Sequence, residues 1–143
     1  MIIKQISVFL ENRPGTLAEV LEVLGEHSVN IRAMSVADTA DFGILRLIVN
    51  EADKVERVLK GASFAVKTTP VLAMKVADEP GGLLAHVKKL TAGGINIEYV
   101  YAFATTASSE ARVVLKVDDL ARAERTLYGD GPQDAGEGPN FYW

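Results

Sequence analysis

The sequence predicts an α+β fold in which one β-α-β-β-α-β unit occurs twice. Two observations support this prediction. An alternating apolar pattern, typical of a strand, passes into a helical apolar pattern at residues 11–17. The same succession returns after 66 residues, which is the separation of Pro14 and Pro80. A constant offset across strand, turn and helix indicates an internal repeat, and 143 residues are enough for two small units.

The elements of the first unit follow from hydrophobic periodicity. Residues 2–10 read as a strand, because Ile6, Val8 and Leu10 fall on one face. Residues 15–26 read as an amphipathic helix with apolar positions spaced i, i+3, i+4 and i+7. The remaining elements are a strand from Val29 to Ala37, a strand from Phe42 to Asn50, a helix from Glu51 to Lys60 and a strand beginning near Phe64. This order is the ferredoxin-like pattern, an antiparallel sheet with helices on one face.

The second unit is predicted from matches at the same offset. The matched pairs are Pro14-Gly15 with Pro80-Gly81, Leu17 with Leu83, Asn30-Ile31 with Asn96-Ile97, Arg46 with Arg112 and Asp53 with Asp119. Beyond Asp119 the register slips by one residue. We place the units at 1–68 and 69–143, with almost no linker between them.

The C-terminal part of the second unit changes character. Residues 129–143 form a Gly/Pro-rich acidic tail that ends in Phe141, Tyr142 and Trp143. The second unit has no obvious fourth strand, which leaves a sheet edge with unpaired backbone groups. We expect the three terminal aromatic residues to dock on the protein and cover such an edge.

The turn between the first strand and the first helix carries the main functional signal. Pro14 suits the entry to a helix, since its nitrogen needs no hydrogen-bond partner. Gly15 has no Cβ, so a small molecule can approach the backbone closely. The N–H groups that open a helix favour a carboxylate or phosphate. The alternative, a tight strand-to-helix turn with no ligand, stays open.

Two such units, each with a Pro-Gly-x-Leu turn and an Asn-Ile start to the second strand, resemble tandem ACT domains. The resemblance covers residues 2–128, and its strongest block is residues 8–17 followed by Val29-Asn30-Ile31. It implies a regulatory module that binds small effectors, most often amino acids, at the first loop and against the second strand of a neighbouring unit.

An amino-acid ligand fits the chemistry of these residues. Backbone N–H groups after each Pro-Gly can hold its carboxylate, and acidic or amide side chains can accept from its ammonium group. The candidate ligand-binding residues are Glu11, Asn12, Arg13, Pro14, Gly15, Thr16, Leu17, Asn30, Ile31, Asp78, Glu79, Pro80, Gly81, Gly82, Leu83, Asn96 and Ile97. Asn12, Asp78, Asn30 and Asn96 can equally serve only to hydrogen-bond the local backbone. The second loop has Asp78-Glu79 where the first has Asn12-Arg13, so the two loops need not bind the same molecule.

Composition argues against several other functions. The net charge of −4 disfavours a nucleic-acid partner, and the absence of cysteine excludes thiolate chemistry. No apolar run approaches the roughly 18–20 residues of a membrane span, and no secretory signal pattern precedes the first strand. His27 and His86 read as solvated surface histidines. We therefore expect no catalytic residues, no metal and no cofactor, and a cytoplasmic location.

One strand keeps a rival function open. Tyr99, Tyr101 and Phe103 alternate, so all three are predicted on one face of a sheet, where aromatic rows can stack RNA bases. Packing in a core or subunit interface explains the same pattern.

These observations together favour a non-enzymatic regulatory protein that senses a free amino acid and forms a homodimer. The alternative is the regulatory subunit of an amino-acid biosynthetic enzyme, which implies a separate catalytic partner. Residues 10–37 also resemble the small subunit of acetolactate synthase.

Overall fold

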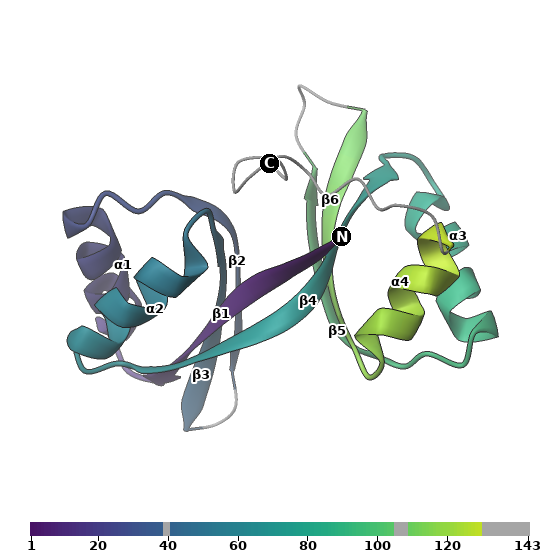
Figure 1. Ribbon diagram of the computed structural model, residues 1–143. Helices are drawn as coiled ribbons and strands as arrows, with labels where there is room; N and C mark the ends of the chain where they lie inside the picture. Colours follow the sequence, from purple (N-terminus) through teal and green to yellow (C-terminus); the bar gives the residue numbers. More distant parts are fainter. Residues whose placement is uncertain (39–40, 105–108, 130–143) are drawn as a thin grey trace. The chain divides into compact units, whose positions relative to one another are not determined.

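The computed structural model describes residues 1–38, 41–104 and 109–129. These residues form six strands and four helices (Figure 1), so the predicted α+β fold is confirmed. The elements are β1 (Ile2–Glu11), α1 (Thr16–Glu26), β2 (Ile31–Asp38), β3 (Phe42–Val49), α2 (Ala52–Gly61), β4 (Ala65–Ala77), α3 (Gly82–Ala92), β5 (Ile97–Ala104), β6 (Glu110–Val117) and α4 (Leu120–Tyr128).

The chain divides into two compact units, but not as two successive halves. The first unit is Lys4–Thr69, and the second unit is Pro70–Trp143 together with Met1–Ile3. No linker separates them, because β4 runs without a break through Thr69 and Pro70. The sequence predicted a division after residue 68 and did not predict that the first three residues belong to the second unit.

The strands of the first unit are neighbours in the order β2-β3-β1-β4, which is one part of a six-stranded sheet. β3 pairs antiparallel with both β1 and β2, and α1 and α2 lie on one face of the sheet (Figure 1). Its core joins alternate residues of β1 and β3 to the inward faces of both helices. The fully buried members are Ile6, Val8, Val20, Leu24, Leu45, Leu47, Val55 and Leu59.

The second unit repeats this arrangement in the order β1-β4-β6-β5, with α3 and α4 on one face (Figure 1). β6 pairs antiparallel with β4 and β5. Its outermost strand is the start of β1: the Ala73 N–H donates to the Met1 carbonyl at 2.8 Å, and the Met1 nitrogen donates to the Ala73 carbonyl at 3.2 Å. Two reciprocal bonds are those of an antiparallel pair. The strand that seemed missing from the second unit is therefore supplied by the other end of the chain.

The repeat does not keep one offset, which corrects the sequence alignment. β2 and β5 begin 66 residues apart, at Ile31 and Ile97, but β3 and β6 begin 68 apart, at Phe42 and Glu110. Arg46 therefore matches Val114 and not Arg112. The same holds for Asp53, whose partner is not Asp119. The two extra residues lie in the turn before β6, because a hairpin turn tolerates insertions that a paired strand does not. The slip is thus two residues, and it comes before β6 rather than after Asp119.

With this corrected alignment, the two units differ in the residues on their helix-free faces, meaning the sheet faces opposite the helices. In the first unit, Arg46 lies across from Ser7 on one neighbouring strand and from Ser35 on the other. Its counterpart Val114 lies across from Ala73. Three polar residues of the first unit thus correspond to Ala73, Val114 and Tyr101 in the second.

The turns before α1 and α3 also differ in backbone packing. Thr16 opens α1, and Gly82 occupies the matching position at the start of α3. A Cβ added to Gly82 would collide with the backbone carbonyl oxygen of Ala77. Only glycine fits there, for a steric reason that does not involve its φ angle.

This collision predicts the effect of an alanine at position 82. Gly82→Ala should lower the free energy of unfolding by about 1–3 kcal/mol, since the obstructing atom is backbone and cannot rotate away. Gly25→Ala in α1 is the matched control, because nothing lies within 4 Å of its added Cβ. The control should gain roughly 0.5–1 kcal/mol from helix propensity. Urea denaturation measures both, and equal stability of the two variants would contradict the collision.

Candidate functional site

The predicted loops lie between strand and helix in both units. The first loop is residues 12–15, between β1 and α1, and the second loop is residues 78–81, between β4 and α3. Gly15 (φ 93°) and Gly81 (φ 83°) cap the helices in the left-handed conformation, which favours glycine. A Cβ at either position would meet nothing within 4 Å, so each glycine has open space on the side where a side chain would project.

Side-chain and backbone hydrogen bonds hold the first loop in place. The Thr16 hydroxyl lies 3.0 Å from the Glu11 carbonyl and 3.2 Å from the Arg13 carbonyl, both of which accept from it. The Asn12 N–H donates to the Asp41 carbonyl at 3.1 Å, which ties the loop to the turn before β3. Residues of the first loop are exposed, whereas the Leu17 side chain packs against the first core. Leu17 can therefore offer a ligand only its backbone N–H.

One arginine at the first loop contacts two carboxylates and offsets part of their negative charge. The Arg13 Nε lies 3.0 Å from a Glu11 carboxylate oxygen, and its Nη1 lies 3.6 Å from Glu19. The hydrogen bond to Glu11 and the charge of Glu19 raise the pKa of Arg13 above its usual value. Glu11, expected to accept a ligand's ammonium group, is thus already engaged by Arg13.

The second loop has the same backbone course but other chemistry. The Gly82 N–H donates to the Glu79 carbonyl at 3.0 Å, so this helix-opening N–H is already used within the loop. In the first loop the hydroxyl of Thr16, rather than its N–H, contacts the matching carbonyl, that of Arg13. The second loop carries two acidic side chains, Asp78 and Glu79, and no basic one.

The Asn-Ile starts of the second strands lie far from the loops of their own units. Ile31 pairs with Val49 at one end of β3, while Glu11, which leads into the first loop, pairs with Phe42 at the other end. Seven residue steps of a strand span roughly 24 Å. A single amino acid cannot bridge that distance, so within one unit the first loop and Ile31 do not form a common site.

The second unit repeats this separation. Ile97 pairs with Val117, at the opposite end of β6 from Glu110. The preceding residue has a local structural task, because the Asn96 N–H donates to the Asp118 carboxylate at 3.0 Å and its carbonyl accepts from the Asp118 N–H. Both bonds use backbone groups of Asn96, so the role predicted for its side chain stays a prediction.

Each loop is held by a backbone hydrogen bond that the sequence did not predict. Asp41 accepts from the first loop, and Ser109 accepts from the Asp78 N–H at 2.9 Å in the second. Both contribute backbone carbonyls, so no side-chain pattern could have identified them. They show that each loop is held by the turn between the second and third strands of its unit.

The register of β5 confirms that Tyr99, Tyr101 and Phe103 occupy positions on one face of the second sheet, the helix-free one. Basic side chains of β6 share that face, but each has an acidic partner: Lys116 binds Glu98 at 2.7 Å, and Arg112 lies 3.5 Å from Glu110. Such pairing reduces the positive potential that phosphates require.

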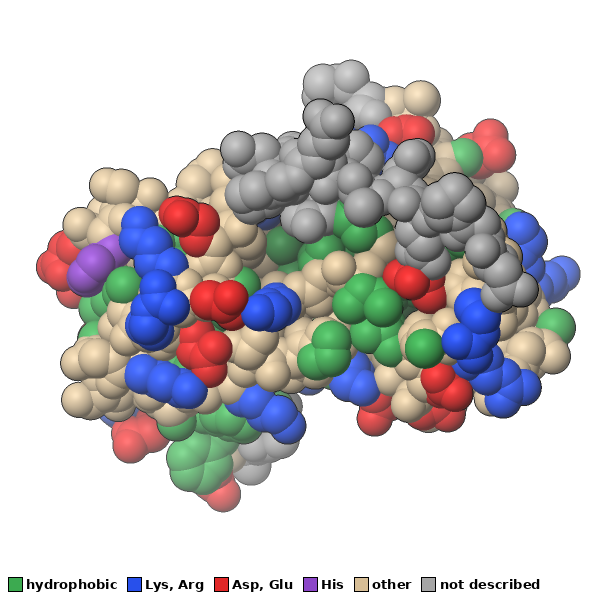
Figure 2. All heavy atoms as spheres, viewed as in Figure 1, with side chains coloured by type: hydrophobic (Ala, Val, Ile, Leu, Met, Phe, Trp, Pro, Cys, Tyr) green, Lys and Arg blue, Asp and Glu red, His purple; other side chains and the backbone are tan. Residues whose placement is uncertain are grey.

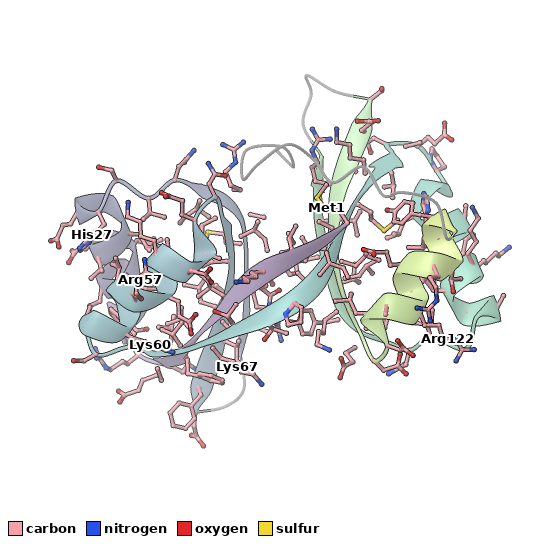
Figure 3. All side chains as sticks on the ribbon, in the orientation of Figure 1. Met1, His27, Arg57, Lys60, Lys67 and Arg122 are labelled. Atoms are coloured by element: carbon pink, nitrogen blue, oxygen red, sulfur yellow. The ribbon has the colours of Figure 1, made fainter. Side chains whose placement is uncertain are left out.

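Elsewhere the surface charges mix in sign. Over α2, Lys54 pairs with Glu51 and Lys60 with Glu56, and blue and red side chains alternate there in Figure 2. Arg57 and Lys60 project from α2 in Figure 3, and His27 lies at the end of α1.

Among the described residues, no group of three or more acidic or histidine side chains is arranged to hold a metal ion. None of the described helices combines the length and apolarity needed to span a membrane. The aromatic tail residues 141–143 lie outside the described part of the chain, so their docking stays a prediction.

Comparison with known proteins identifies relatives along most of the chain. BT0572 of Bacteroides thetaiotaomicron is 41% identical, with a TM-score of 0.84, and the match covers 89% of this chain and 87% of that one. The regulatory subunit of aspartate kinase from Thermus thermophilus matches with a TM-score of 0.63 at 16% identity, over 90% of this chain and 94% of that one. The Thermus flavus regulatory subunit gives 0.62 at 15% identity, with the same coverage of both chains. At these identities the two kinase subunits show a shared fold only. No protein of curated function matches the sequence.

A family described as an ACT domain pair matches residues 1–129. That range covers the six strands, the four helices and both loops described above. The chain belongs to the ACT domain pair family.

Proposed function

We propose that this protein is a regulatory module that binds a free amino acid, and that the first loop holds the ligand's carboxylate. The family supports a regulatory rather than a catalytic role, because ACT domains act as effector-binding modules. The observation that carries the proposal is the glycine-capped start of α1. There no other residue lies within 4 Å of the position that a Gly15 Cβ would take, and the N–H groups that open a helix favour an anion.

Two differences favour the first loop over the second. The Thr16 hydroxyl, and not its N–H, contacts the Arg13 carbonyl, whereas the Gly82 N–H is bonded to Glu79. The first loop thus keeps one more donor for a carboxylate. Arg13 also offsets the negative charge around the first loop, whereas Asp78 and Glu79 repel an anion at the second.

Because Glu11 is paired with Arg13, the ammonium group of an amino acid needs a further hydrogen-bond acceptor. Asn12 lies in the same loop, and its side-chain amide has a carbonyl oxygen that can accept a hydrogen bond. Asn30, Ile31, Asn96 and Ile97 remain candidates only for a site to which a second copy of the chain contributes, because each lies at the far end of its own sheet.

Binding of a free amino acid should raise the melting temperature. A ligand that binds only the folded state at one hundred times its Kd stabilises the protein by about 2.7 kcal/mol. A thermal-shift screen of the twenty amino acids at millimolar concentration tests this. If none of the twenty shifts the transition, the sensor proposal is wrong.

Substitution of the two loop glycines should locate the site. Gly15→Asn places a side chain in the open space before α1, and asparagine tolerates the left-handed conformation better than other side chains. We expect it to weaken binding at least tenfold by titration calorimetry with the amino acid found in the screen. Gly81→Asn is the matched control at the second loop and should bind as the wild type does. The reverse pattern would assign the ligand to the second loop, and wild-type affinity in both would exclude the two loops.

We further propose that the protein is a cytoplasmic homodimer, with regulation of a separate catalytic chain as the alternative arrangement. Regulatory subunits of aspartate kinase share this fold, which suggests an amino-acid biosynthetic enzyme as the catalytic partner in that alternative. Light scattering of the purified protein should give twice the monomer mass of 15.4 kDa. A monomer mass at micromolar concentration would contradict the dimer. Co-purification with a biosynthetic enzyme would favour the regulatory subunit.

A further inference from the structure

Two strands of this protein belong to both units at once. β1 contributes Met1–Ile3 to the second unit and the rest of its length to the first. β4 contributes residues 65–69 to the first unit and residues 70–77 to the second. Each sheet is therefore completed by a strand whose other end lies in the other unit.

The second unit holds the start of β1 by specific contacts. Met1 and Ala73 exchange two backbone hydrogen bonds, and Ile3 is 6% exposed. The Ala73 N–H points to β1 and not to β6, so its hydrogen bond reports directly on whether this outer strand is in place.

The first unit holds both shared strands next to the points where they leave it, and α2 provides both contacts. Lys4, the first residue of β1 in the first unit, binds the Asp53 carboxylate at 2.8 Å. Thr68, the penultimate residue of β4 in that unit, donates to the Glu56 carboxylate at 2.7 Å. The exposed ion pair between Lys4 and Asp53 contributes little energy by itself. The main anchor of β1 is its burial in the first core through Ile6, Val8 and Leu10.

The far end of β1 leads directly into the first loop. Glu11, its last residue, accepts from the Thr16 hydroxyl through its carbonyl. The same ten-residue strand thus carries the proposed ligand loop at one end and the outer strand of the second unit at the other.

We propose that β1 couples the two units energetically, so that the stability of the first unit controls the pairing of Met1–Ile3 in the second. A strand of three residues cannot hold its place without an anchor. Loosening of β1 in the first unit therefore frees Met1–Ile3, and ordering of the first loop stabilises them. The coupling itself does not depend on any ligand, whereas its use in regulation rests on the proposed function.

Hydrogen exchange of the Ala73 amide, followed by NMR on the full chain, tests the coupling without a ligand. Val20→Ala removes two methyl groups from the first core, where Val20 is fully buried. We expect the exchange protection of Ala73 to fall about tenfold, although the substitution lies in the other unit. Glu22→Ala, at an exposed position of the same helix, is the control and should leave Ala73 unchanged. Unchanged Ala73 protection in Val20→Ala would overturn the proposal.

A second variant tests whether β1 is the route. Two glycines inserted between Ile3 and Lys4 interrupt β1 but keep all of its residues and leave β4 intact. The insertion alone should lower the exchange protection of Ala73, because Met1–Ile3 then lose their anchor, and Val20→Ala should cause no further loss in this background. Wild-type protection of Ala73 in the insertion variant would contradict the proposal. The same insertion after Gly61, at the end of α2, is the control and should preserve the coupling. A tenfold effect that persists after the Ile3 insertion would exclude β1 as the route.

A ligand arm separates this inference from the proposed function. The amino acid identified by thermal shift should increase Ala73 protection in the wild type but not in the Ile3 insertion variant. If Val20→Ala lowers Ala73 protection and no amino acid raises it, the coupling stands and the sensor proposal fails.

Discussion

Each unit of this protein completes its sheet with a strand that continues into the other unit, and the rest of the structure depends on that constraint. Units of about 65 residues bury only a marginal core, so each outer strand matters. Ala65–Thr69 complete the first sheet and continue directly into the second, while Met1–Ile3 complete the second and continue into the first. Two uninterrupted strands replace the flexible linker that separates ordinary domains. The two units therefore share two strands, although each unit has its own core.

Within that frame the two copies have diverged at the positions where a ligand would bind. Thr16 braces its loop by a hydroxyl, and Gly82 has no room for a side chain at all. Arg13 has no counterpart in the second loop, which is purely acidic. These differences change both the hydrogen bonding of the helix-opening N–H groups and the local charge. The two copies thus keep the same backbone course but differ in charge, because only the first loop contains a basic side chain.

The separation between each loop and the second strand of its unit has a topological cause. In a β-α-β-β-α-β unit the first helix carries the chain back along the sheet, so the second strand starts at the end opposite the loop. Ile31 and Ile97 are therefore as far from the first and second loops as a strand length allows. Sequence similarity groups these residues in one motif, but the fold places them at opposite ends. Any site that uses both must draw on more than one unit.

The sequence alone determined the order of strands and helices in the first unit, the two Pro-Gly turns and the internal repeat. These features are encoded by residues within about one turn or one strand of each other, as with Pro14-Gly15 and the alternation of Ile6, Val8 and Leu10. Only the tertiary structure decided which segment completes the second sheet, that Arg46 matches Val114, and that the Asp41 carbonyl holds the first loop. Strand partners and register depend on backbone groups distant in sequence and on turn length, and neither leaves a pattern in the side chains. Met1–Ile3 illustrate this reason directly, because they read as the start of the first strand and yet complete the second sheet.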